Sequence, residues 1–162
     1  MTSTFQFDDF TLRPATEADL PLARAWNAAD PDHVWEMGTE RYWIRPEGGW
    51  EKCSECFVLE DFEPVFFLRT TRIWQHEQMS IEISIQFNRA DLTTPLWRTM
   101  NGMLAGMKWL ERTLPANGIH AIYFSSKSER LIRFAQVRLG FSEVENFGES
   151  LAMGFRRFRK II

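Results

Sequence analysis

One carboxylate, Glu82, stands on the polar face of a predicted strand, where proton transfer is one of its possible roles. It lies in residues 79–87, where apolar and polar side chains alternate, so the segment predicts a strand with three isoleucines on one face. The other face carries Glu82, Ser84 and Gln86. A carboxylate on a buried sheet face can have a raised pKa, which suits it to act as an acid or a base. A solvent-facing or arginine-paired glutamate fits the same pattern, and the sequence leaves these interpretations open.

The other chemistry-bearing side chains have weaker patterns. His76 falls in an expected hairpin turn and His120 at an expected strand start, so we expect both at the surface, whereas His33 lies in an aromatic-rich region and could line a cleft. Cys53 and Cys56 form one C-x-x-C, but a structural zinc site needs four ligands and no second pair follows. The pair precedes a strand rather than opening a helix, which disfavours a redox motif. We therefore predict no metal site.

Composition is typical of an ordinary globular protein. The 162 residues, 44% hydrophobic and 25% charged, predict one domain over residues 1–162 with a substantial core. A net charge of -3 gives no field that favours nucleic acid or anionic membrane. No apolar run approaches the roughly 20 residues of a membrane span, and the N-terminus lacks the basic region of a signal peptide. We expect a cytoplasmic protein. The basic run at residues 156–160 is interpreted as a solvated tail, with a binding patch as the alternative.

The first elements are marked by a break and a cap. Phe10–Pro14 alternates and ends at a proline, which predicts a strand. Thr16 and Asp19 then form a capping-box-like helix start, and this helix should end before Asp30. Residues 33–45 can form a second helix, with aromatic side chains at helical spacing.

Three strands and a helix–strand–helix–strand sequence should follow. Short strands are predicted at 57–60 and 65–69, joined by a turn at 61–64, and a polar connection at 74–78 leads to the strand that carries Glu82. Thr94-Pro95 resembles an N-cap followed by proline at the first helical position, so a helix is predicted over 95–114.

In the second half of the chain, glycines mark a close helix contact, a turn and the end of a helix. Gly102 and Gly106 predict close approach of the long helix to the sheet, and Asn117-Gly118 turns the chain into a strand over 119–124. A strand–helix–strand unit of this length requires a right-handed crossover and a parallel strand pair. Residues 128–139 then predict an amphipathic helix stopped by Gly140 and followed at once by a strand.

Aromatic content is high, at 14% with seven tryptophans. The first third of the chain holds an aromatic group made of Trp26, Trp35, Tyr42, Trp43 and Trp50. Packing of N-terminal helices on the sheet explains it, because aromatic side chains bury large areas. An aromatic-lined substrate cleft is the alternative.

This order of elements resembles the Gcn5-related N-acetyltransferases (the GNAT superfamily) over essentially the whole chain. Arg138-Leu139-Gly140-Phe141 resembles the family's Lys/Arg-Leu-Gly-Phe signature, and Leu12-Arg13-Pro14 with the capping box resembles its opening. Residues 151–153 resemble its last strand. The resemblance implies an α+β, three-layer fold with a mixed, mostly antiparallel central sheet and flanking helices. It also implies an acyl-CoA, such as acetyl-CoA, as co-substrate.

The resemblance assigns expected roles to particular residues. Glu82 is the candidate general base, and Ser125 is the candidate hydrogen-bond donor to the leaving thiolate, with Ser126 beside it. In the family the pantetheine arm pairs with a strand edge that corresponds to residues 84–88, and pyrophosphate meets a turn that corresponds to 92–98. The residues expected to bind the cofactor are therefore Gln86, Phe87, Asn88, Thr93, Thr94, Arg98 and Ser128.

Two features depart from the family pattern. Residues 91–96 stand in place of the glycine-bearing phosphate loop, with Asp91 where a cation is expected, although Arg89 or Arg98 could supply positive charge. Gln136 or Ala135 stands where the family often has a tyrosine that protonates the thiolate. Glycines matter in the loop because they permit close backbone approach to phosphate.

Three hypotheses about function result. The first is an N-acyltransferase acting on an amine of a small molecule or of a protein N-terminus. The second is a GNAT-like module that binds a ligand or protein partner without acyl transfer, and the two departures from the family pattern favour it. The third is an unrelated α+β binding domain. The exposed aromatics or the edge of the final strand could support a homodimer.

Overall fold

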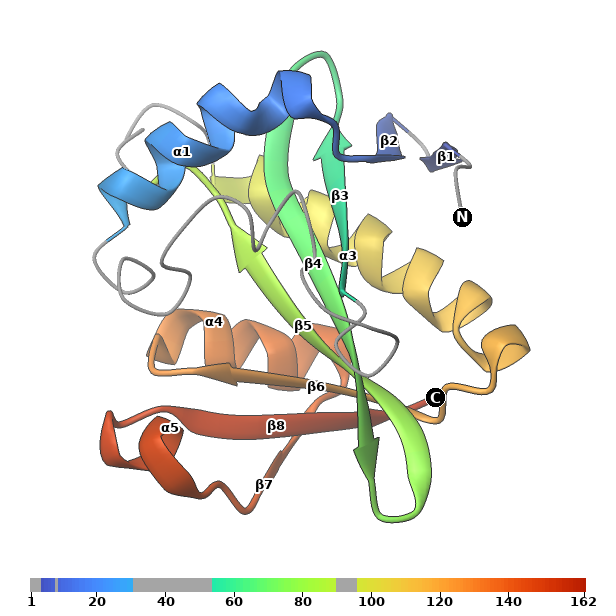
Figure 1. Ribbon diagram of the computed structural model, residues 1–162, viewed down its shortest axis with the longest axis vertical. Helices are drawn as coiled ribbons and strands as arrows, with labels where there is room; N and C mark the ends of the chain where they lie inside the picture. The colour runs from blue at the N-terminus through green and yellow to red at the C-terminus, as the bar shows by residue number, and fades with distance from the viewer. Residues whose placement is uncertain (1–3, 8, 31–53, 90–95) are drawn as a thin grey trace. The chain divides into compact units, whose positions relative to one another are not determined.

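The computed structural model describes residues 4–7, 9–30, 54–89 and 96–162. Its strands form one mixed sheet in the order β1-β2-β3-β4-β5-β6-β8-β7, flanked by helices, which confirms the predicted fold class (Figure 1). The chain divides into two compact units, residues 1–72 with 84–106 and residues 73–83 with 107–162. We describe each unit by itself.

The first unit holds the N-terminal strands, one helix and parts of three longer elements. Its complete elements are β1 (Phe5–Phe7), β2 (Phe10–Pro14), α1 (Leu20–Ala29) and β3 (Ser54–Glu60). Most of β4 (Pro64–Gln75), the end of β5 (Gln78–Gln86) and the first part of α3 (Leu96–Thr113) complete it. The strands β1, β2, β3 and β4 pair antiparallel in that order.

An arginine fixes the start of α1 against the sheet. The capping box forms as predicted: the Asp19 carboxylate accepts from the Thr16 backbone N–H at 2.8 Å, within a short 3-10 turn at Glu17–Asp19. The Arg13 guanidinium on β2 donates to both Asp19 oxygens, at 2.7 and 2.8 Å, and to Glu60 at 3.0 Å. The pKa of Asp19 is lowered, chiefly by the hydrogen bonds from Arg13.

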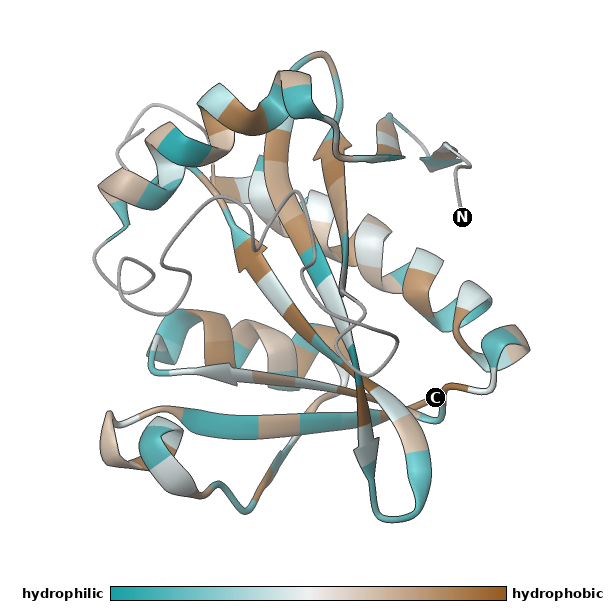
Figure 2. Ribbon diagram, in the orientation of Figure 1, coloured by the Kyte–Doolittle hydropathy of each residue, from teal (hydrophilic) through white to brown (hydrophobic). Residues whose placement is uncertain are grey.

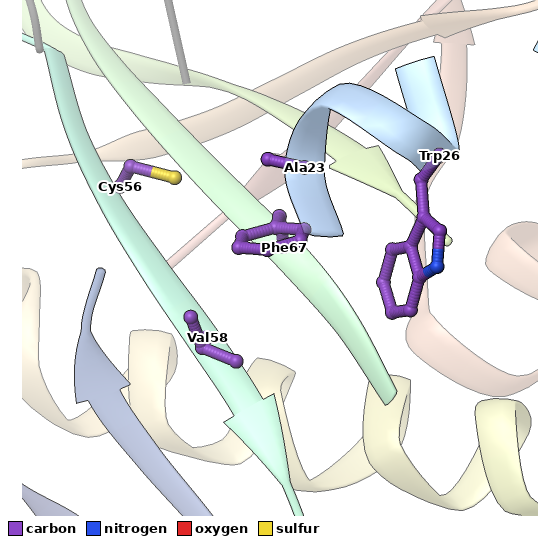
Figure 3. Close-up of a cluster of buried hydrophobic side chains, with 5 residues drawn as sticks. All are labelled: Ala23, Trp26, Cys56, Val58 and Phe67. Carbon is purple, nitrogen blue, oxygen red and sulfur yellow. The ribbon is translucent and has the colours of Figure 1, made fainter. Parts of the chain in front are cut away.

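The helix α1 packs on one face of β3 and β4. Ala23 and Trp26 of α1 lie against Cys56 and Val58 of β3 and Phe67 of β4, all buried (Figure 3). The indole of Trp26 meets the Phe67 ring edge-on, with centroids 5.4 Å apart. Packing is therefore the role of Trp26; the other aromatic residues of its group, at 35, 42, 43 and 50, lie outside the described residues.

The opposite face of the same two strands receives α3. A Cβ atom added at Gly102 would lie 2.9 Å from Leu59 and 3.2 Å from Phe66, so the backbone there approaches as closely as only glycine allows. At Gly106 the corresponding distances are 3.7 and 3.8 Å, ordinary contact. A β-bulge at Leu59/Glu60 lets Glu60 pair with Pro64, and Val65 lies 3.4 Å from the same Gly102 position.

These two glycines predict opposite outcomes for the same substitution. Gly106→Ala should stabilise the fold by about 0.5–1 kcal/mol, because alanine is the better helix former and the space exists. Gly102→Ala gains the same propensity but must displace buried Leu59 and Phe66, and overpacking costs about 1–3 kcal/mol. Urea denaturation of both variants measures the difference. Equal effects at the two positions would contradict the packing described.

The second unit is built around β6. Its elements are β6 (Ala121–Ser126), α4 (Glu129–Phe134), β7 (Ser142–Val144), α5 (Gly148–Ala152) and β8 (Arg156–Ile161), with the start of β5 and the rest of α3. The strand β6 pairs parallel with β5 and antiparallel with β8, and β7 pairs antiparallel with β8. Phe124 and Phe158 stack at 5.1 Å in the core, and Phe141 meets Phe124 edge-on.

The helix before Gly140 ends as predicted, but with one wider turn. After α4 the chain continues as a π-helical turn, Ala135–Leu139, and Gly140 adopts a left-handed conformation with φ of 77°. The Lys160 ammonium of β8 donates to the Leu139 carbonyl and pairs with Glu111 of α3, both at 2.5 Å. A lysine from the last strand thus neutralises the carbonyl end of this helix.

The basic C-terminal run is a strand, and its interpretation as a solvated tail was wrong. Arg156–Ile161 forms β8 and lies between β6 and β7, although Figure 2 shows it in mainly hydrophilic colours. Phe158 at its centre is fully buried, while Arg156 pairs with Glu129 and Glu143. The final strand was one of two features that could support a homodimer, but β8 has a neighbour on each side, β6 and β7, and is not an edge strand of the sheet.

Other boundaries differ in detail. Residues 151–153, expected as the last strand, follow a left-handed glycine and belong to or flank α5. The connection predicted at 74–78 is only a two-residue turn, His76 and Glu77, both with positive φ, between longer strands. The helix predicted at 33–45 and the cap at Thr94 lie outside the described residues. No helix in the described ranges combines the length and apolar character that a membrane span requires.

Candidate functional site

The centre of the second unit is a short parallel ladder. The strands β5 and β6 pair at Ile81↔Ile122 and Glu82↔Tyr123, so they run side by side in the same direction, as the crossover predicted. The described ladder stops there, while β6 continues to Ser126 and pairs with β8 along its whole length. Among described residues, Phe124–Ser126 therefore have no ladder partner on the side away from β8. Glu82 occupies the last rung.

The Glu82 carboxylate faces an arginine that sequence analysis did not single out. Arg157 of β8 places Nη2 3.9 Å from Glu82 Oε2, a distance that permits an ion pair but is too long for a hydrogen bond. The Glu82 side chain is 39% exposed and that of Arg157 is 13% exposed. The guanidinium carbon also lies 4.9 Å from the centroid of the Tyr123 ring, within range of a cation–π contact. The expected burial of Glu82 on a sheet face is therefore not found. The two alternatives left open by the sequence apply together, since Glu82 is accessible and is paired with an arginine.

Ser125 lies on the same face of the sheet. It pairs across the ladder with Arg157, and directly paired residues of an antiparallel pair project to the same side. Ser126 projects to the other side, is buried, and its hydroxyl accepts the Ser128 N–H at 3.1 Å. Ser128 is the N-cap of α4, since its hydroxyl accepts the Leu131 N–H at 3.4 Å. Ser126 and Ser128 therefore have structural roles at the start of α4, whereas the proposed role of Ser125 stays open.

In the first unit, Gln86 is the most unusual of the residues expected to bind a cofactor. Its side chain belongs to the last residue of β5 and is 1% exposed, yet neither Oε1 nor Nε2 has a hydrogen-bond partner among the described residues. Buried amides without partners are rare, because each loses its hydrogen bonds to water. Phe87 and Asn88 follow directly and are partly buried.

Arg98, which the sequence led us to expect at the phosphates, is held by a carboxylate and a backbone carbonyl. Its guanidinium is buried and donates to both oxygens of Asp61, at 2.6 and 2.7 Å, and to the Glu63 carbonyl at 2.9 Å. The Arg98 hydrogen bonds lower the pKa of Asp61 to about 2. Because its charge is matched by the partly buried carboxylate of Asp61, this arginine anchors the start of α3 to the β3–β4 turn.

The other cation proposed for phosphate is also paired. Arg89 Nη1 lies 3.0 Å from Oδ1 of Asp30, a buried carboxylate at the end of α1. Thr93 and Thr94, and with them most of the turn at 92–98, lie outside the described residues. The cations described near that turn therefore each have a carboxylate partner.

Searches among solved structures connect this geometry with known proteins. Ribosomal-protein-S5-alanine acetyltransferase from Vibrio fischeri superposes with a TM-score of 0.63, at 12% identity over 98% of this chain and 96% of that one. An aminoglycoside acetyltransferase in complex with coenzyme A gives 0.66, at 17% identity over 94% of each chain. Spermidine N-acetyltransferase from Vibrio cholerae, in complex with CoA and spermine, gives 0.59, at 17% identity over 94% and 95%.

The chain has the fold of the Gcn5-related N-acetyltransferases. No protein-family model and no curated protein sequence matches it. The fold resemblance stated from the sequence is therefore confirmed by structure, at identities that define architecture alone.

In this GNAT fold the second cysteine of the C-x-x-C pair, Cys56, is not a reactive thiol. Cys56 is buried in the core that α1 covers, and desolvation raises the pKa of its thiol to about 12. Cys53 lies outside the described residues. Within the described ranges, no group of three or more histidine, cysteine or carboxylate side chains could hold a metal ion.

Sequence reasoning missed Tyr123 and Arg157, which complete the polar face around Glu82. The alternation of β6 would have placed Tyr123 and Ser125 on one side of the strand. Arg157 carried no such signal, because its neighbours on both sides are basic and the run resembles a solvated tail.

Proposed function

We propose that this protein is an N-acyltransferase that moves the acyl group of acetyl-CoA, or another acyl-CoA, to an amine of a small molecule or a protein N-terminus. The observation that carries the proposal is the parallel ladder that ends at Glu82, beside a stretch of β6 whose backbone edge has no strand partner in the part of the chain that the structure describes. The likeness to acetyltransferases, two of them in complex with CoA, supports the same class.

The reaction requires one bond to form and one to break. The acyl-CoA supplies an activated thioester carbonyl. Glu82 accepts a proton from the acceptor's ammonium, directly or through water, so that the amine nitrogen can bond to the acyl carbon as the carbon–sulfur bond breaks. The nitrogen loses its second proton through water to the departing thiolate, to which the Ser125 hydroxyl, on the same face, donates a hydrogen bond, and Glu82 then releases its proton to solvent.

The described residues fit the acyl end of the co-substrate better than its phosphate end. The pantetheine arm carries amides, and the amide of Gln86, which has no partner among the described residues, can donate to and accept from such groups. At the other end, Arg98 and Arg89 pair with Asp61 and Asp30. We therefore assign Gln86, Phe87 and Asn88 to the pantetheine arm. The phosphates are left to the turn that includes Thr93 and Thr94. Phosphate contacts by Arg98 and Ser128 are the weakest of the expected roles.

The paired arginines favour one alternative. A GNAT-like module that binds another ligand or a protein partner, without acyl transfer, would need no cation for a diphosphate. Such a module would retain the fold and the polar face around Glu82 but would not respond to CoA.

Calorimetric titration and thermal unfolding with acetyl-CoA separate the two functions. At 100 times its dissociation constant, acetyl-CoA should stabilise the fold by about 2.7 kcal/mol, equivalent to a rise in Tm of about 5–10 °C. S-acetyl-pantetheine, which lacks the nucleotide, should retain part of this effect, and adenosine 3′,5′-bisphosphate should have little. Absence of binding at millimolar acetyl-CoA would reject the acyltransferase and support the binding module.

A further inference from the structure

The polar face of the second unit holds opposite charges in fixed positions. Glu82 and Arg157 lie 3.9 Å apart, and Arg157 is held over the Tyr123 ring at 4.9 Å. A cation–π contact with an aromatic ring restrains the position of a guanidinium. A ligand would meet a negative and a positive group a few ångströms apart.

The hydrogen-bonding capacity of Arg157 is not used within the described structure. Its Nε is buried and has no hydrogen-bond partner, and its contact with Glu82 is longer than a hydrogen bond. A guanidinium has five N–H donors in a planar fork that matches the two oxygens of a carboxylate. Arg156, the adjacent residue, behaves differently, because it donates to Glu143 at 2.7 and 2.8 Å and to Glu129 at 3.1 Å.

We propose that Arg157 binds the carboxylate of the acceptor, so that the substrate is a free amino acid whose ammonium meets Glu82 while its carboxylate meets Arg157. This inference rests on the proposed acyltransferase function and names its substrate class. An amino acid carries both charges within a few ångströms, which matches the spacing of the two side chains. A polyamine would instead bring a second positive charge toward the guanidinium, at a cost in affinity.

The test compares acids with amides. Acetyl transfer from acetyl-CoA is measured through the CoA thiol that it releases. The acceptors compared are the common L-amino acids, their carboxamides and spermidine. The carboxamides keep the ammonium and the side chain but lack the carboxylate. We expect the best amino acid to exceed its amide by at least about 10-fold in kcat/KM, since a hydrogen bond to a charged group is lost.

Arg157 variants locate the effect. Arg157→Gln should lower kcat/KM for the acid by about 10- to 100-fold, mainly through KM, and leave the amide unchanged. Arg157→Lys should retain part of the preference, because it keeps the charge without the fork. Arg156→Gln is the matched control, because it removes the same charge from the adjacent position on the opposite face. It should leave kcat/KM unchanged for both the acid and the amide. If Arg157→Gln does not fold, the acid–amide comparison and the lysine variant still decide.

Each outcome decides the inference. It is overturned if amides or spermidine serve as well as acids, if no free amino acid is acetylated, or if Arg157→Gln lowers the rates for acid and amide alike. Binding of acetyl-CoA by calorimetry is measured alongside. Binding together with transfer to amides or spermidine would leave the acyltransferase in place and remove only this substrate class, whereas absence of acetyl-CoA binding would remove the acyltransferase itself.

Discussion

Glu82→Gln is expected to lower the turnover number for acyl transfer by about 100- to 10,000-fold, the usual range for removing a general base. The amide has nearly the same size as the carboxylate but cannot accept the proton of the acceptor's ammonium. Affinity for acetyl-CoA should remain nearly unchanged, because Glu82 is placed to serve the amine and not the co-substrate. Steady-state kinetics and calorimetric titration measure the two quantities separately.

The control for this variant is another carboxylate on a strand of the same unit. Glu143 of β7 also forms an ion pair with an arginine of β8. Its partner is Arg156, whereas the partner of Glu82 is Arg157. Glu143→Gln should leave turnover unaltered. An unaltered rate in Glu82→Gln, with the protein folded and binding acetyl-CoA, would remove Glu82 from the mechanism.

Asp61→Asn is expected to destabilise the fold by about 3–5 kcal/mol, because it leaves the buried guanidinium of Arg98 without its main counter-charge. Arg98 has a side chain only 6% exposed. Asparagine keeps the Oδ1 acceptor used by the backbone N–H groups of Phe62 and Glu63, at 2.6 and 3.2 Å, so the turn itself should survive. Glu63 has a carboxylate 3.3 Å from Arg98 and can compensate in part, which favours the lower end of the range.

Urea denaturation at pH 7 measures this loss, and Glu143→Gln again provides the comparison. Its partner Arg156 is 38% exposed, so removal of that solvent-screened ion pair should cost far less than the loss expected for Asp61→Asn. Similar losses in the two variants would mean that Arg98 is not held in a buried pair.

The Asp61 pair also predicts how stability depends on pH. The pKa of Asp61 is about 2 in the folded protein, against 3.8 for the ordinary side chain. Its folded pKa is depressed, so its contribution is complete above the ordinary value and is lost as pH falls from about 4 toward 2. The contribution amounts to about 2 kcal/mol. Asp61→Asn should therefore lose less stability than the wild-type protein over this interval, in denaturation curves recorded at stepwise lower pH.

The sequence predicted those parts of the fold that local signals determine. The capping box at Thr16 and Asp19, the alternation around Glu82 and the left-handed glycine at 140 each mark an element by its own residues, and all three were found. The order of such elements was sufficient to indicate the GNAT fold.

The sequence did not reveal which charges would meet. Arg98 and Asp61 are 37 positions apart, and only folding shows that they neutralise each other. The same limitation applies to Arg157 and to the whole of β8, since a run of basic residues looks solvated until its partners on neighbouring elements are known. The candidate site was therefore predicted at Glu82 and Ser125, and its second half, Tyr123 and Arg157, required the structure.

The short ladder at Glu82 also affects how the backbone of β6 meets solvent. Peptide groups of Phe124–Ser126 that point away from β8 have no strand to bond to among described residues, so water or a bound molecule must satisfy them. Unpaired peptide groups of this kind normally occur on the outermost strand of a sheet, where they invite unwanted strand addition. Here they occur on an inner strand, β6, where a bound molecule can form the hydrogen bonds that these groups lack among the described residues.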